Sequence, residues 1–387
     1  MKIRVPDYYK DFKCIAERCT DTCCAGWQVD VDDASYEYYK TIKGPFGDRL
    51  KSVMVDGKKG QEGQFRICPD GRCPFLNDKN LCDLYAELGE EALCVTCDQY
   101  PRYNCEFGNT RETGIALSCI TAAELILKDN RTPGFVEYEE ENAYPSMNNI
   151  DAELYFALVK ARDKAYEIIW NRNRNIWDRM TLLMYYSVDL QKMMKKPKEI
   201  ANVINKYDEA YMDSCLDAVQ KESKASDCVI ENYKGIFFTY LKQVIIKKEW
   251  PEMIDMLYNT MYYGKFDEVI KGYSEYSKDT EYELENIITY FVYRYFLKGV
   301  FDRDVLTKVK MGIISTLLIY QCDAGVWNSK GGKLTYDDRV NIAHLYSREV
   351  EHSEENFEKL CKAFKKKRRF LPKNLVRLMQ YNVNNVE

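Results

Sequence analysis

The sequence contains almost no histidine, no excess of basic residues and no long apolar run. Histidine occurs only at His344 and His352, and 61 acidic residues against 56 Lys and Arg leave a net charge of −5. A protein that coats nucleic acid needs the opposite charge balance. The longest apolar stretch, residues 311–320, is far shorter than the roughly 20 residues that span a bilayer, and residues 1–7 lack the apolar core of a secretion signal. We therefore expect a soluble, cytoplasmic protein that binds neither nucleic acid nor membranes, while its oligomeric state is left open.

Cysteine is abundant by contrast, and it is concentrated in the first third of the chain. Of 15 cysteines, 11 precede residue 120: Cys14, Cys19, Cys23, Cys24, Cys68, Cys73, Cys82, Cys94, Cys97, Cys105 and Cys119. Such crowding indicates disulfides in a secreted chain but metal or redox chemistry in a cytosolic one. The odd total and the missing secretion signal favour metal. Because the two histidines are far from these cysteines in sequence, the ligands should be almost purely thiolate, which suits zinc or iron–sulfur.

Two details of the cysteine pattern constrain the site. Cys23 and Cys24 are adjacent and cannot easily face one tetrahedral ion, so they serve either different metals or one bridged cluster. The alternative interpretation, free thiols packing as small apolar side chains, does not explain the crowding. It does fit the isolated cysteines of the helical stretches, which we expect in the core: Cys215, Cys228, Cys322 and Cys361.

The chain divides into three regions and is predicted to be mainly α. Residues 1–129 form a small, loop-rich, cysteine-rich domain, residues 130–150 read as a linker, and residues 151–387 form an all-helical domain. The helical candidates of the first region are residues 34–42, 83–88 and 121–128.

Apolar residues at 3–4 spacing mark the helices of the C-terminal region, beginning after a credible N-cap at Asp151. The expected helices run from residue 151, and over 176–194, 199–221, 229–248, 282–299, 303–321, 335–350 and 353–369. Residues 282–299 are apolar nearly all round and should form a central, buried helix. The helix over 303–321 is expected to end before Gly325.

Four stretches within residues 8 to about 127 together resemble the motif pattern of a known protein family. They are Cys14…Cys19…Cys23-Cys24-Ala25-Gly26-Trp27-Gln28-Val29-Asp30, Cys73-Pro74-Phe75-Leu76-Asn77 with Leu81-Cys82, Thr96-Cys97-Asp98-Gln99-Tyr100-Pro101-Arg102, and Leu117-Ser118-Cys119 followed by Ala122-Ala123-Glu124. This pattern resembles the flagellin lysine N-methylases, within the wider cysteine-cluster families marked by spaced cysteines that end in a Cys-Cys pair. Ile120 stands where the family commonly has proline.

The resemblance implies a protein-lysine N-methyltransferase that acts on flagellin with S-adenosylmethionine as methyl donor. It also implies an iron–sulfur cluster of the four-iron type, with zinc as the alternative metal. The ligand candidates that match the family pattern are Cys14, Cys19, Cys23, Cys24, Cys73, Cys82, Cys97 and Cys119. Eight thiolates exceed one four-iron cluster, so either a second metal exists or some are structural. Cys68, Cys94 and Cys105 fall outside the pattern and are second choices.

The reaction so implied needs a group that removes a proton, because a lysine ammonium has no lone pair. The sequence locates neither this acceptor nor the donor site: a Gly-rich turn after a strand and the Cys-x3-Cys-x2-Cys pattern of radical enzymes are both absent. Tyrosine, with 31 copies, supplies phenols and ring faces that favour ammonium groups, although such stripes are usually packing. Asp30, Asp32 and Asp33 read as solvated turn carboxylates. The alternative functions are a non-enzymatic zinc or iron–sulfur interaction module and an electron-transfer or metal-handling protein.

Overall fold

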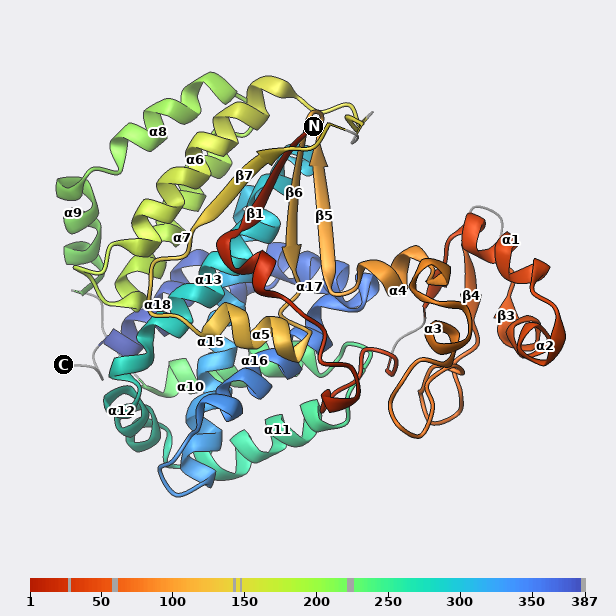
Figure 1. The fold of residues 1–387 in the computed structure, drawn as a ribbon. Helices are drawn as coiled ribbons and strands as arrows, with labels where there is room; N and C mark the ends of the chain where they lie inside the picture. Colours follow the sequence, from red (N-terminus) through yellow and green to blue (C-terminus); the bar gives the residue numbers. More distant parts are fainter. Residues whose placement is uncertain (27–28, 58–61, 142–143, 147, 221–225, 384–387) are drawn as a thin grey trace.

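The computed structural model describes residues 1–26, 29–57, 62–141, 144–146, 148–220 and 226–383, so Trp27 and Gln28 of the first motif lie outside the described residues. A large, mostly helical body carries a smaller, loop-rich module that projects from one side (Figure 1). Each part has its own group of buried apolar side chains, drawn from residues 107–383 in the body and 29–94 in the module. The predicted class, mainly α with a loop-rich cysteine region, is confirmed.

The predicted segment 199–221 forms two helices, and the helices over 249–257, 266–276 and 372–383 were not predicted. The other predicted segments of the body correspond to helices. The helices of the body are α5 (Ile120–Leu127), α6 (Ala152–Trp170), α7 (Ile176–Met193), α8 (Ile200–Lys206), α9 (Glu209–Gln220), α10 (Ser226–Tyr240), α11 (Glu249–Leu257), α12 (Phe266–Tyr276), α13 (Glu281–Tyr295), α14 (Gly299–Asp302), α15 (Val305–Ser329), α16 (Tyr336–Glu351), α17 (Glu354–Lys366) and α18 (Pro372–Val383). Asp151 caps α6 as predicted, since its side chain accepts a hydrogen bond from the Leu154 N–H. α13 is the expected buried helix, and it packs against α15, α5 and α6.

Two predicted helix ends are wrong, and tertiary contacts explain both. The helix expected over 229–248 stops at Tyr240, because the backbone N–H groups of Val244 and Ile246 donate to Asn356 and Glu349 on distant helices. The helix expected to end before Gly325 continues to Ser329. In the same region Cys228, expected in the core, is exposed, since it lies on the solvent side of α10.

Gly325 is required for close packing inside α15 and does not end the helix. A Cβ added there would lie 2.0 Å from the Leu257 Cδ2 of α11. By length and composition α15 is apolar enough to cross a membrane, but 89% of its most apolar window is buried by its neighbours. A buried core helix meets the same two criteria.

We expect Gly325→Ala to destabilise the body by about 1–3 kcal/mol through overpacking, although alanine is the better helix former by about 1 kcal/mol. Urea unfolding followed by far-ultraviolet circular dichroism measures the change. In a Leu257→Ala background the clash is gone, and the glycine substitution should be neutral or stabilising there. Equal costs in both backgrounds would show that close packing is not the reason for this glycine.

A four-stranded sheet covers one side of the helices, and the sequence did not predict it. Its order is β5 (Arg102–Phe107), β6 (Thr110–Ile115), β1 (Lys2–Pro6) and β7 (Phe135–Glu139). β1 pairs parallel with β6 and antiparallel with β7, so the N-terminal strand lies inside the sheet. Figure 1 shows these strands lying across the helices on the side from which the module projects.

The packing divides the chain at places other than the expected boundary at residue 129. Phe107, Leu117 and Ile120 belong to the apolar core of the body, and residues 135–139 of the expected linker form β7. The reason is the sheet, which ties the N-terminal strand and residues 102–139 to the helices. The module keeps its own helices and a small sheet: α1 (Asp33–Thr41), α2 (Gly44–Val53), α3 (Asp83–Leu88), α4 (Val95–Gln99), β2 (Asp30–Val31), β3 (Met54–Val55) and β4 (Gly63–Phe65).

Candidate metal centre

Cysteines from four separate segments of the module line one cavity of about 500 Å³, part of which is open to solvent. The lining cysteines are Cys23, Cys24, Cys73, Cys82, Cys94 and Cys97. No disulfide joins any of these six cysteines within the described residues. Apolar and aromatic side chains complete the walls, among them Phe65, Phe75 and Tyr100. The cavity therefore gathers soft sulfur donors in a mostly apolar surrounding.

Short backbone pairings bring the first two cysteine segments together. The Cys73 N–H donates to the Cys24 carbonyl at 2.8 Å, and the Gly26 N–H donates to the Gly71 carbonyl at 2.9 Å. Both glycines have positive φ, +84° and +80°, which glycine adopts without a steric penalty. The chain then turns around Asn77, whose side-chain oxygen accepts from the Leu81 N–H and so returns Cys82 toward Cys73.

Helix N-termini position three of the thiols. Cys82, Cys94 and Cys119 occupy the N-cap positions of α3, α4 and α5. Burial raises the pKa of Cys82, and hydrogen bonds from the first backbone N–H groups of α3 oppose that rise. The same two effects act on Cys119, whose pKa rises to about 11. Free N–H groups at a helix start favour thiolates, the form in which cysteine binds metal.

The thiols also interact with one another. Burial raises the pKa of Cys73 to about 12, and the charges of Cys24, Cys82 and Cys68 add to that rise. A hydrogen bond from the Cys23 thiol lowers the pKa of Cys24 to about 7. Each anion at this site therefore makes the next one harder to form, as expected where thiols crowd without a bound cation.

The structure brings together most of the ligands implied by the motif, but not all of them. Cys23, Cys24, Cys73, Cys82 and Cys97 line the cavity. The other three candidates, Cys14, Cys19 and Cys119, are absent from its lining. They lie close enough to one another and to Cys23 for their charges to affect each other's pKa. The thiols thus form two groups that meet at the Cys23–Cys24 pair.

The structure places the three second-choice ligand candidates in different surroundings. Cys94 lines the cavity beside Cys97, with which it shares a thiol hydrogen bond. Cys68 acts electrostatically on Cys73 at the edge of this group. Cys105 is on β5, packed against the core of the body, where charged groups including Lys298 and Glu112 act on it. Spacing along the chain did not distinguish these three residues.

Both histidines lie against the cysteine segments, which sequence separation had concealed. His344 and Arg348 share one face of α16, and His352, four residues further on, is the C-cap of this helix. His344 Nε2 is 2.8 Å from Asp21 Oδ2, and an Arg348 N–H donates to the Ala25 carbonyl at 2.7 Å. Burial alone would raise the pKa of Asp21, but the His344 hydrogen bond and the Arg348 charge hold it below its usual value. α16 therefore holds the loop that carries Cys19, Cys23 and Cys24.

His352 connects this helix to the wall of the cavity. Its Nε2 is 3.4 Å from the hydroxyl of Tyr100, which donates to the Ser118 carbonyl at 3.0 Å. Burial, with the charge of Arg348, lowers the pKa of His352 to about 3, so the imidazole is neutral at physiological pH. Of the turn carboxylates, Asp32 caps α1 and accepts from the Val95 N–H, which fixes the start of α4.

As the side chains stand in the described part of the chain, no three His, Cys, Asp or Glu residues are placed to hold a single metal ion. The thiols nevertheless surround a common space. Fold and cavity together define a helical protein with a thiolate-lined module docked on its side.

Comparison with known proteins identifies the family. Residues 162–378 match the FliB lysine N-methylase C-terminal domain, so the chain belongs to this family. It is 27% identical over 130 residues to a flagellar biosynthetic protein FliU of Salmonella muenchen, covering 32% of this chain and 76% of that protein. It is 27% identical over 130 residues to a lysine-N-methylase of Salmonella typhimurium, and 26% identical over 128 residues to one of Salmonella choleraesuis.

These matches cover 32% of this chain and 32% of each lysine-N-methylase, so the chain aligns with about a third of their length. No solved structure matches the chain.

Proposed function

We propose that the protein transfers methyl groups from S-adenosylmethionine to lysine side chains of flagellin, and that its module binds an iron–sulfur cluster of the four-iron type. The family membership over residues 162–378 carries the proposal. The lysine-N-methylase and flagellar names of the relatives support the substrate. The resemblance of the cysteine motifs supports S-adenosylmethionine and the iron–sulfur cluster as cofactors.

The donor set of the cavity fits a cluster. Several thiols outside disulfides face one space with mostly apolar walls, and this chemistry suits zinc or iron–sulfur. The thiol lining suits either metal. The resemblance of the cysteine motifs favours the iron–sulfur cluster, with zinc as the alternative. When bound, the cluster would supply iron that is held by thiolates and can chelate the amino and carboxylate groups of the donor.

The residues around the cavity hold the cysteine loop in a fixed position on the body. Asp21, His344 and Arg348 fix the loop of Cys23 and Cys24 on α16. Tyr100 lines the cavity, and His352 of the body lies 3.4 Å from its hydroxyl. Methyl transfer from a sulfonium to an amine is an in-line displacement, and alignment of the reacting atoms is its main requirement. A rigid attachment between module and body serves that requirement.

The direct test incubates the anaerobically purified protein with flagellin and methyl-labelled S-adenosylmethionine. We expect label on flagellin lysines, detected by mass spectrometry of flagellin peptides. Cys228→Ser is the matched control because this thiol is exposed and remote from the motifs, and it should leave labelling unchanged. Unlabelled lysines with intact donor and folded protein would refute the methyltransferase.

The colour of the same preparation distinguishes an iron–sulfur cluster from zinc. An iron–sulfur protein is brown with iron and sulfide in the analysis, whereas a zinc protein is colourless. Reversible reduction without donor binding would instead indicate electron transfer.

A further inference from the structure

A buried arginine of the body reaches the loop that carries the adjacent cysteines. Arg348 lies on α16 and is 1% exposed. Its guanidinium donates to the Ala25 carbonyl at 2.7 Å and, more weakly, to the Thr22 carbonyl at 3.5 Å. Thr22 and Ala25 directly precede and follow Cys23 and Cys24 in the chain. Arg348 therefore contacts the loop on both sides of the cysteine pair.

The charge of Arg348 is permanent, and its effect extends to the thiols and to the cavity wall. A guanidinium stays protonated at physiological pH, and salt screens a buried charge much less than an exposed one. A hydrogen bond from Cys23 is the main cause that lowers the pKa of Cys24, and the charges of Arg348 and Arg72 lower it further. Burial raises the pKa of Tyr100, and the charge of Arg348 opposes that rise. The guanidinium thus favours negative charge in this cavity.

Two carboxylates lie near Arg348, and both have closer partners elsewhere. Asp21 Oδ2 is 3.9 Å from Arg348 Nε, whereas Asp21 Oδ1 is only 2.5 Å from Lys247 Nζ. Glu349 accepts two backbone N–H groups from the segment that leads into α11. Within the described residues, the hydrogen bonds of Arg348 go to the carbonyls of the cysteine loop and not to a carboxylate. Its charge is therefore directed at the loop.

This arrangement suits a buried group of negative charge. A cluster held by thiolates is anionic, and burial of an anion is costly unless a cation lies near it. The motif cysteines all precede residue 120, whereas α16 falls within the family-matched residues 162–378. The body thus brings a cation to the module at the cysteine pair, where the two thiol groups meet.

We propose that Arg348 is a positioning residue for the iron–sulfur cluster, which holds the Cys23–Cys24 loop and supplies the fixed positive charge that sets the reduction potential of the cluster. The inference rests on the proposed function for the presence of the cluster, but not for the methyl transfer. A nearby positive charge stabilises the reduced, more negative state of a cluster, so it raises the reduction potential. A nearby negative charge lowers it.

Potentiometric titration of the anaerobically purified full-length protein, with dithionite as the reductant, measures this potential. One electron passes from dithionite to the cluster, and no bond to the chain forms or breaks. Arg348→Gln should make reduction about ten-fold less favourable, which lowers the potential by about 59 mV for a one-electron couple. Arg348→Lys keeps the charge and should therefore recover most of this shift.

Asp21→Asn separates the effect of charge from the effect of holding the loop. Asp21 and Arg348 both attach this loop to α16. If they acted by attachment alone, both variants would loosen the loop and shift the potential in the same direction. The charge role predicts opposite directions, because Asp21→Asn removes a negative charge and should raise the potential. Shifts of the same sign in Asp21→Asn and Arg348→Gln would overturn the proposal.

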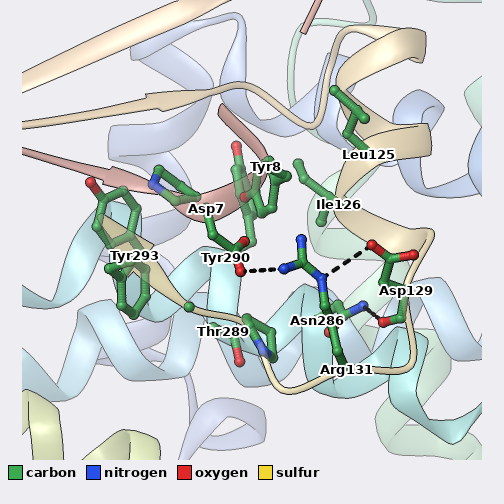
Figure 2. A pocket seen from close by; sticks show the side chains of 14 residues that line it. Asp7, Tyr8, Leu125, Ile126, Asp129, Arg131, Asn286, Thr289, Tyr290 and Tyr293 are labelled. Atoms are coloured by element: carbon green, nitrogen blue, oxygen red, sulfur yellow. Dashed lines mark hydrogen bonds and ion pairs between the residues drawn. The ribbon is translucent and has the colours of Figure 1, made fainter. Parts of the chain in front are cut away.

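Arg131→Gln is the matched control, because it removes the same charge from a different part of the body. Figure 2 shows Arg131 in another cavity, where it is 2.8 Å from Asp7 and 3.2 Å from Asp129. Among the described residues no cysteine lines that cavity. Arg131→Gln should therefore leave the potential unchanged.

The remaining outcomes distinguish this inference from the proposed function. An unchanged potential in Arg348→Gln, with its iron retained, would refute the role of Arg348 and leave the cluster and the methyl transfer in place. If Arg348→Gln loses its iron, the sign of the shift in Asp21→Asn decides, and a potential that is not raised there overturns the proposal. A colourless, iron-free unaltered protein would refute the cluster and this role together. The expected shifts without any labelling of flagellin would refute the methyltransferase alone.

Discussion

Replacing Cys73 and Cys97 together by serine should remove most of the bound iron and expose the module to protease, while the helical body stays folded. Both thiols line the shared cavity. The module has a small apolar core, drawn from residues 29–94, so bound metal should contribute a large part of its stability. Structural zinc contributes about 10 kcal/mol or more to comparably small folds. Iron analysis and limited proteolysis with mass spectrometry measure the two effects.

Two single variants test the prediction at cysteines that the sequence motifs did not distinguish. Cys94 lines the cavity, whereas Cys105 lies on β5 against the core of the body. We therefore expect Cys94→Ser to lower the iron content and Cys105→Ser to retain it. Iron loss in Cys105→Ser but not in Cys94→Ser would mean that the cluster is held somewhere other than this cavity.

Arg162→Met should destabilise the body by about 3–5 kcal/mol, because it leaves the Glu112 carboxylate buried without a counter-charge. Arg162 on α6 and Glu112 on β6 are 0% and 4% exposed, and two hydrogen bonds of 2.5 and 2.6 Å join them. This pair connects the sheet to the helices. The midpoint of urea unfolding, followed by far-ultraviolet circular dichroism, reports the loss.

The double variant Arg162→Met/Glu112→Leu tests the cause. Replacing both partners of a buried pair by apolar side chains is often neutral or stabilising. The double variant should therefore recover most of the stability lost by Arg162→Met. A double variant as unstable as the single one would indicate that packing around Arg162, and not the lone carboxylate, is responsible.

Local sequence signals predicted much of the helical body. The apolar spacing after Asp151 and the all-round apolar segment of α13 depend on neighbouring residues alone, and both elements formed as expected. Gly325 shows the limit of such signals. A glycine near a helix end usually stops it, but here the approach of Leu257 decides its role. No local pattern contains that contact.

The sequence predicted that the cysteines form a metal centre, but it did not predict which residues line that centre. Cysteine crowding and the adjacent Cys23–Cys24 pair pointed to metal, and these two thiols do lie where two thiol groups meet. Cys94 could not be separated from Cys105 by spacing. His344 and His352 are hundreds of residues from the cysteines, yet α16 packs them against the same loop.

The sequence by itself determined the mainly helical class, the thiolate character of the module and the family resemblance, since each follows from residue type and short-range spacing. The tertiary structure decided which thiols share a space, which helix holds their loop, and where the N-terminal strand lies in a sheet. These properties depend on contacts between residues far apart in the chain, and such contacts leave no periodic or compositional trace.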